Sequence, residues 1–149
     1  MSLIDTITRD IASAMREKNQ GRLTALRMLK AALMNREVEK GRALDGAEEL
    51  AVVGSLVKQR HDSVEQFQRG GRPDLVAKEQ AEIAVLEAYQ PPAASADDVQ
   101  AAVEAAVAET GATSAKDMGR VMKAAIARLA GKTADGKAVS DAVRRRLGA

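Results

Sequence analysis

The fold is decided by residues 58–75, whose sequence is Lys58-Gln-Arg-His-Asp-Ser-Val-Glu-Gln-Phe-Gln-Arg-Gly-Gly-Arg-Pro-Asp-Leu75. Apolar residues recur at helical spacing as far as Phe67, and the pattern stops at Gly70-Gly71. Pro73 suits the first turn of a new helix, because a residue there needs no N–H partner. An apolar stripe then continues to Pro91-Pro92, where a helix has to end. The stretch therefore predicts a helical hairpin with well-marked ends.

The composition is that of an ordinary globular chain with few aromatic residues. Hydrophobic residues make up 46% of the 149 residues and charged residues 30%, which does not indicate general disorder. Phe67 and Tyr89 are the only aromatic residues, so an aliphatic core is expected, and this favours packed helices over a sheet. The absence of Cys excludes disulfides and thiol catalysis. We expect a cytoplasmic protein, because the sequence contains no membrane-spanning apolar run and its N-terminus resembles an amphipathic helix rather than a secretory signal.

Residues 1–90 are predicted to form a four-helix bundle-like domain, because four apolar stripes are joined by short loops. The first helix is expected to be capped by Ser2 and the third to run from about residue 47 to 68. On the first three helices of this domain, the side chains expected to face inward are Leu3, Ile4, Ile7, Ile11, Ala14, Met15, Leu23, Leu26, Leu29, Leu33, Leu50, Val53, Val57, Val64 and Phe67.

Residues 91–94 are predicted to be a stiff Pro-rich linker, and residues 95–149 a small three-helix tail domain. We expect the tail helices to begin at Ser95, Ser114 and Ser140, the first two supported by an acidic residue three positions later. The strongest apolar stripe of the tail contains Met118, Val121, Met122, Ala125, Ile126 and Leu129. The sequence thus predicts an all-α protein with two domains.

Basic residues are concentrated near the C-terminus, although the net charge is only +2. Residues 114–149 contain nine basic and three acidic residues, and residues 91–113 contain four acidic and no basic ones. A basic segment of this kind suggests a polyanionic partner. The candidate RNA-binding residues are Lys116, Arg120, Lys123, Arg128, Lys132, Lys137, Arg144 and Arg145, followed by Arg146.

Three of these residues, Lys116, Arg120 and Lys123, recur at i, i+4 and i+7, so we expect them on one face of one helix. A basic helical face suits phosphate-rich RNA. The scarcity of aromatic residues argues against stacking of splayed bases, and backbone contact with folded RNA fits better. A basic face that serves only solubility is the alternative.

Gly70, Gly71 and Arg72 are a second candidate anion site, because backbone amides and a guanidinium at a helix start can hold a phosphate. The stretch lacks the preceding strand and the Gly-Lys-Ser/Thr of a P-loop. A turn that requires glycine is the simpler interpretation.

Candidate catalytic and metal sites are weak. His61, Asp62 and Ser63 are the residue types of a hydrolase triad, but neighbours on a helix point about 100° apart and cannot face one another. Carboxylates such as Glu79 and Glu82 lack the Glu-x-x-His pairs of a metal centre in a bundle, and we interpret them as surface partners of basic residues. We therefore expect no metal, no cofactor and no catalytic residue.

Several segments together resemble the GatB/YqeY family, which comprises small helical proteins and the tail domain of the GatB component of the tRNA-dependent amidotransferase. The segments that carry the resemblance are 26–33, 58–63 with Phe67, 71–75, Glu79 with 82–83, 89–91, 116–122 and 131–136. The resemblance covers nearly the whole chain and implies a helical bundle followed by a three-helix tail. By analogy, Gly119 either permits close helix packing, the interpretation that we favour, or close approach of an RNA backbone.

The resemblance implies a role beside tRNA, since the related tail domain helps to hold tRNA during amidation of its amino acid. The amidase machinery of that complex has no counterpart here, so carbon–nitrogen ligase activity with glutamine as amide donor would be inherited from the larger relative in name only. We predict a non-catalytic tRNA-binding accessory protein with tRNA, and a protein of translation, as partners. The alternatives are a protein–protein adaptor that uses residues 1–90 and, least favoured, an amidase or ligase.

Overall fold

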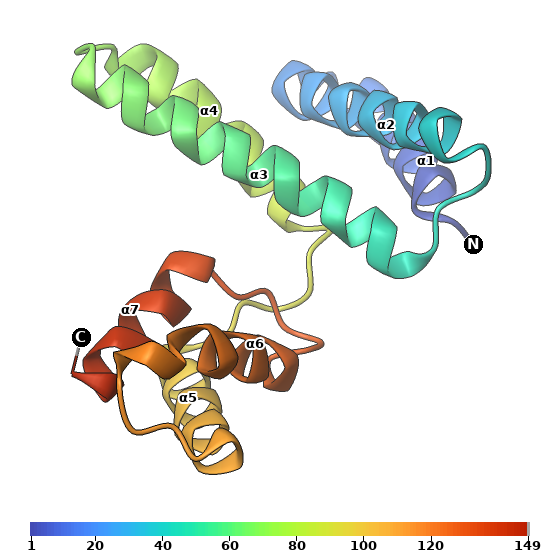
Figure 1. The fold of residues 1–149 in the computed structure, drawn as a ribbon. Coiled ribbons are helices and arrows are strands. Elements are labelled where there is room, and N and C mark those ends of the chain that lie inside the picture. Colours follow the sequence, from blue (N-terminus) through green and yellow to red (C-terminus); the bar gives the residue numbers. More distant parts are fainter. Residues whose placement is uncertain (149) are drawn as a thin grey trace. The chain divides into compact units, whose positions relative to one another are not determined.

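The computed structural model describes residues 1–148, which form seven α-helices and one short 3-10 helix and contain no β-strand. The prediction of an all-α protein is confirmed. The chain divides into two compact units, Met1–Gln90 and Pro91–Ala149, which are called the N-terminal unit and the tail unit below (Figure 1). The elements are α1 (Leu3–Arg16), α2 (Gln20–Lys40), α3 (Gly46–Arg69), α4 (Pro73–Glu87), α5 (Ala96–Thr110), η1 (Ala115–Asp117), α6 (Met118–Arg128) and α7 (Gly136–Leu147).

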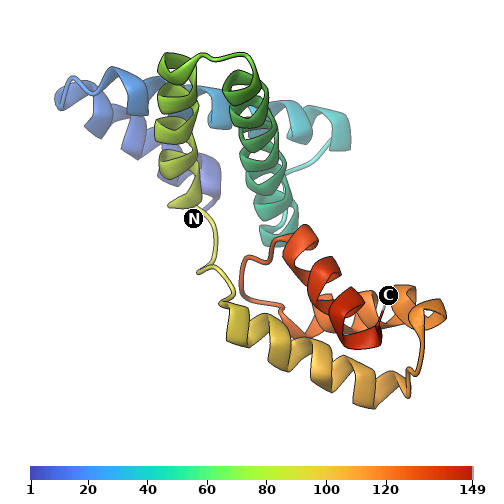
Figure 2. The same cartoon turned by 90° about the vertical axis from the view of Figure 1, so that its left-hand side faces the viewer.

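In the N-terminal unit, α2 is the central helix: it packs against α1, α3 and α4, while α3 and α4 run side by side as the predicted hairpin (Figures 1 and 2). Met15 and Leu50 were predicted to face inward, but they are 55% and 40% exposed. Burial of one Leu side chain contributes about 1.5–3 kcal/mol. The core consists of Ile7, Ala14, Leu23, Leu26, Leu29, Leu33, Val53, Val57, Val64, Ile83 and Leu86.

Side-chain caps fix three of the helix starts in this unit. Ser2 and Asp5 form a capping box on α1, as expected, and Asp45 and Glu48 form a second one on α3. The side chain of Asn19 accepts from the amide of Arg22 and starts α2. Caps of this kind typically contribute about 0.5–2 kcal/mol each.

In the tail unit, α5, α6 and α7 all pack against one another. Ser95 and Asp98 form the predicted capping box on α5. One predicted helix start is wrong, since α7 begins at Gly136 under an Asp135 cap instead of at Ser140. Ser114 does precede a helical segment, the 3-10 helix η1, but its side chain makes no cap, and α6 begins only at Met118. The buried core is formed by Val99, Ala102, Val103, Ala106, Val107, Val121, Ala125, Leu129, Val139 and Val143.

The Pro-rich segment 91–94 is tied to the loop between α6 and α7 through Thr133. The Thr133 hydroxyl donates to the carbonyl of Pro91 at 2.7 Å, and its amide donates to the carbonyl of Pro92 at 2.9 Å. The amide of Ala94 in turn donates to the Thr133 carbonyl at 2.7 Å, which completes a parallel bridge between Ala93 and Thr133. Proline cannot donate a backbone hydrogen bond but its carbonyl accepts one, so an extended Pro-Pro segment can pair in this way. The segment expected to be a linker is therefore part of the tail unit.

Candidate nucleic-acid interface

The predicted basic residues of the tail are all exposed, but they are distributed over four segments. Lys116 lies in η1, Lys132 in the loop after α6, and the others on α6 or α7. The prediction that Lys116 shares a helical face with Arg120 and Lys123 is wrong, because the chain makes a 3-10 turn through Asp117 and α6 starts only at Met118. The i, i+4, i+7 spacing holds only along a continuous α-helix.

Four basic side chains of the tail unit are held by acidic neighbours. Arg120 pairs with Asp117 beside it. The other three pairs run to α5: Arg128 to Glu109 at 3.1 Å, Lys132 to Asp98 at 2.8 Å and Arg146 to Glu104 at 2.7 Å. The acidic segment before Thr113 thus folds against the basic segment after it, and charges that are separate in the sequence partly neutralise each other in space.

These cations lower the pKa of two of the carboxyl groups that they contact. The ammonium group of Lys132, with further hydrogen bonds from Ser95, lowers the pKa of Asp98 to about 2. The guanidinium of Arg120 and the amide of Thr113 lower the pKa of Asp117. Both carboxylates are therefore ionised at neutral pH and offset the cations that they contact.

Among residues 1–148, five basic side chains of the tail unit form no ion pair: those of Lys116, Lys123, Lys137, Arg144 and Arg145. Arg144 and Arg145 lie in the last turn of α7, where a positive charge also complements the negative end of the helix dipole. These five exposed cations are the part of the predicted site that remains available to an anion.

Gly119 lies in open space near the start of α6. It is exposed, and a Cβ atom built on it has no contact within 4 Å. The favoured interpretation, that this glycine lets two helices touch, is therefore wrong within the described part of the chain, since no neighbouring helix comes near it. The other interpretation, close approach of an RNA backbone, stays a prediction.

The predicted phosphate site at Gly70, Gly71 and Arg72 is occupied by the protein's own groups. Their three amides donate to the last carbonyls of α3, at 2.9, 3.2 and 2.9 Å. The Arg72 guanidinium makes a two-point contact with Asp74 at 2.9 and 3.1 Å. Gly71 has φ +68°, a left-handed conformation that favours glycine. The geometry supports the turn and not the anion site.

A charged cluster between α3 and α4 was not predicted. Arg60 of α3 pairs with Glu79 at 3.0 Å and with Glu82, and its other terminal nitrogen lies 2.8 Å from the sulfur of Met28 on α2. Glu82 is only 4% exposed, so its interpretation as a surface partner is wrong. The polar residue Arg60 within the apolar stripe of α3 was the signal that could have found it, because a buried charge needs a partner on the helix it faces.

The other candidate sites form neither a catalytic nor a metal-binding arrangement among residues 1–148. His61 lies on the exposed side of α3, 4.0 Å from Glu87, and among residues 1–148 it forms no hydrogen bond with a hydroxyl group. In the described chain no three metal-ligating side chains converge. Residues 1–148 also contain no helix that is both long and apolar enough to cross a bilayer.

Comparison with known proteins places the chain in a family. A family model described as Yqey-like protein matches residues 4–147. The chain belongs to this family. The predicted YqeY resemblance is thereby confirmed, and the family model matches residues of both units of the chain.

Curated relatives carry the name altered inheritance of mitochondria protein 41, mitochondrial. The chain is 34% identical over 110 residues to the protein of Eremothecium gossypii, which covers 72% of this chain and 60% of the relative. It is 37% identical over 103 residues to the protein of Kluyveromyces lactis, covering 67% and 56%. The corresponding protein of Lachancea thermotolerans is 33% identical over 103 residues, covering 67% and 55%. The matches thus span about three-fifths or less of these relatives' length.

Proposed function

We propose that this protein is a non-catalytic accessory protein that holds folded RNA, with tRNA as the RNA, through the exposed cations of its tail unit. The observation that carries the proposal is the set of five tail cations without an ion pair among residues 1–148: Lys116, Lys123, Lys137, Arg144 and Arg145.

Physical chemistry favours backbone contact over base reading. Each lysine that neutralises a phosphate releases a condensed counterion, and this release drives association at low salt. Both aromatic residues, Phe67 and Tyr89, belong to the N-terminal unit, so the tail offers no ring on which a base could stack. Lys137 and Arg144 are seven residues apart on α7, about 10 Å along one face, and both can contact the same RNA.

The test compares two triple variants with the same loss of charge. The first removes cations without a partner, Lys116→Gln, Lys123→Gln and Lys137→Gln. The matched control removes paired cations, Arg120→Gln, Arg128→Gln and Lys132→Gln. Retention of a tRNA transcript is measured against salt concentration.

We expect the first variant to reduce the slope of log K against log salt by about 2–3, since each lost phosphate contact contributes about 0.7–0.9. The control variant should change the slope less, because its cations are already partly neutralised by acids. Unchanged tRNA retention by a folded first variant, or an equal loss in both variants, contradicts the proposal.

A protein–protein adaptor is the second candidate function, favoured by one feature of the N-terminal unit. Met34 and Val38 are four residues apart on α2, and they are 49% and 81% exposed. Two exposed apolar residues on one helical face offer an apolar contact to a partner, although a large contiguous patch is the usual mark of an interaction site. The adaptor function predicts a specific partner whose capture resists nuclease and high salt and is lost with Val38→Ser, whereas the RNA function predicts loss with nuclease.

Ligase or amidase activity has no support from the arrangement of side chains. Such chemistry needs a nucleophile with a base in hydrogen-bond reach, and the single histidine, His61, is exposed on α3 and lies 4.0 Å from a carboxylate oxygen of Glu87. The proposal expects no glutamine turnover by the purified protein. Turnover that survives repeated purification would overturn the non-catalytic part of it.

A further inference from the structure

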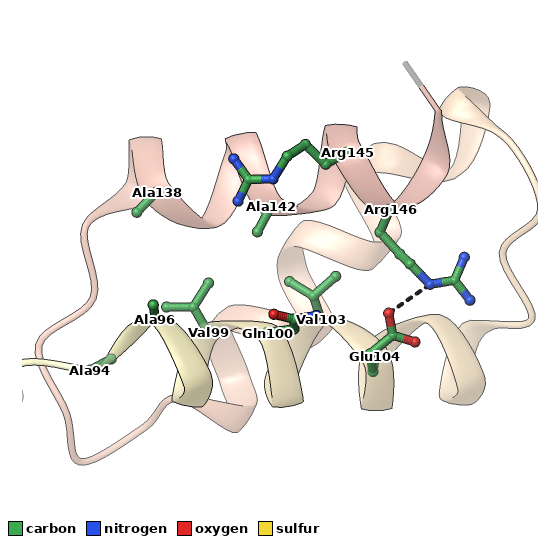
Figure 3. Close-up of a pocket in the computed structure, with 10 residues that line it drawn as sticks. All are labelled: Ala94, Ala96, Val99, Gln100, Val103, Glu104, Ala138, Ala142, Arg145 and Arg146. Atoms are coloured by element: carbon green, nitrogen blue, oxygen red, sulfur yellow. Dashed lines mark hydrogen bonds and ion pairs between the residues drawn. The ribbon is translucent and has the colours of Figure 1, made fainter.

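A groove of about 510 Å³ runs between α5 and α7 of the tail unit. The side chains along its walls are small, because alanines of both helices line the groove. Val99 and Val103 form its buried apolar floor (Figure 3). Arg146 reaches across one end to Glu104, at 2.7 Å, and joins the two helices there. Along α5 the lining extends from Ala96 to Glu104, roughly 12 Å at 1.5 Å per residue, which is about two helical turns.

The groove has one cation that the described residues leave unpaired. Arg145 projects from α7 on the groove side, and Gln100 lines the opposite wall on α5. Within residues 1–148 the Arg145 guanidinium forms neither an ion pair nor a side-chain hydrogen bond, whereas its neighbour Arg146 is held by Glu104. The groove therefore combines an aliphatic floor with a free guanidinium and an amide at its rim.

We propose that this groove is a docking site for an amphipathic helix of a partner protein, with an aliphatic face and a carboxylate placed to meet Arg145. Small side chains on two neighbouring helices let a third helix pack its ridge between them, with Leu or Ile reaching Val99 and Val103. The charge of Arg145 selects an acidic partner and can accept a carboxylate through two parallel hydrogen bonds.

The lining favours a peptide over RNA as the occupant. Aliphatic methyl groups match the side chains of a helix, whereas a nucleobase held without pairing is normally stacked on an aromatic ring, and none lines this groove. The inference goes beyond the RNA proposal and shares only Arg145 with it: the peptide needs the groove and Arg145, whereas the RNA proposal rests on all five tail cations without an ion pair.

The experiment uses the full chain, labelled with ¹⁵N, and two synthetic helical peptides of about 18 residues, long enough for helix formation. Both peptides carry Leu at i, i+3, i+4 and i+7 on an Ala-rich helix, one with Glu and the other with Lys beside the Leu face. We expect the Glu peptide to shift the amide signals of groove residues such as Val99, Gln100 and Ala142. The Lys peptide should leave them in place.

Three variants locate the binding. Arg145→Gln should weaken binding of the Glu peptide about tenfold. The matched control Lys137→Gln lies on the same helix but outside the groove lining, and it should weaken binding about twofold or less. Ala138→Gln fills the groove without changing the charge, so it should remove peptide binding and leave tRNA retention intact. Ala138 is exposed, so this variant is expected to fold.

Three results with the peptides overturn the proposal: no shift of the groove signals at millimolar Glu peptide, equal binding of the Lys peptide, or unchanged binding in Ala138→Gln. A tRNA transcript that shifts the groove signals when the Glu peptide does not would assign the groove to RNA and would also overturn it. Failure of the peptide with tRNA binding intact leaves the proposed function standing.

Discussion

The N-terminal unit contains a buried ion cluster, whereas the ion pairs of the tail unit lie at the surface. The N-terminal unit encloses Arg60 with Glu79 and Glu82, whose side chains are 13%, 13% and 5% exposed. In the tail unit every ion pair lies at the surface, and five further cations have no partner among residues 1–148. Buried charges depend on their partners, whereas exposed charges are held weakly and remain open to exchange with an external anion. The difference between the units is therefore the buried Arg60 cluster, since exposed ion pairs occur in the first unit as well.

The largest expected effect follows from breaking the buried cluster. Arg60→Met leaves Glu79 and Glu82 close together without their cation, and loss of one partner of a buried ion pair typically costs about 3–5 kcal/mol. Urea unfolding followed by circular dichroism measures the change. The free energy of unfolding of the N-terminal unit should fall by this order.

A matched substitution in the tail sharpens the contrast. Arg128→Met breaks the exposed pair with Glu109, and such pairs are typically worth about 0–1 kcal/mol. Equal losses in Arg60→Met and Arg128→Met would show that burial does not separate the two units. A triple variant in which Arg60, Glu79 and Glu82 are all replaced by apolar residues should recover much of the stability, since it leaves no buried charge.

Acid should weaken the tail unit through Asp98. The folded state holds the pKa of this group at about 2, below its ordinary value of 3.8. Between these values the unfolded chain binds more protons than the folded one, so the stabilisation is complete above pH 4 and is lost as the pH falls towards 2. Amide signals of α5, followed during acid titration, report the loss.

Asp98→Asn should flatten this part of the acid dependence, because the amide does not titrate. Asp97→Asn is the matched control: Asp97 is the adjacent residue in the first turn of α5, and among residues 1–148 it forms no ion pair. If Asp97→Asn changes the acid dependence as much as Asp98→Asn does, the contact with Lys132 is not its source.

The fold was largely predictable because its signals are local. Glycine and proline at 70–73, the Ser2 and Ser95 caps and the apolar stripes act within a few residues, and they gave the helices and the hairpin. The predicted start at Ser140 was wrong because Asp135 caps α7 five residues earlier, and periodicity does not decide between two possible caps. The start at Ser114 gave a 3-10 helix before α6 and no side-chain cap.

The candidate site was predictable only as a list of residues. Which cations are free depends on contacts such as Arg128 with Glu109, separated by 19 residues, and Arg146 with Glu104, separated by 42. Periodicity within one helix carries no information on such pairs. The same limit hid the Arg60 cluster and the attachment of Pro91 to Thr133, because both join segments that are distant in the sequence.

The smallest expected effect concerns Gly119, and it tests whether the α6 surface is used. Gly119→Ala should stabilise the tail by about 0.5 kcal/mol, because alanine is the better helix former and its Cβ meets nothing. If RNA backbone approaches this position closely, the added methyl group should also lower tRNA retention a few-fold. Gly46→Ala is the control, since Gly46 begins α3 in the other unit and is equally open. Loss of retention in Gly119→Ala alone places the RNA on α6, whereas unchanged retention in both moves the contact to the cations of α7.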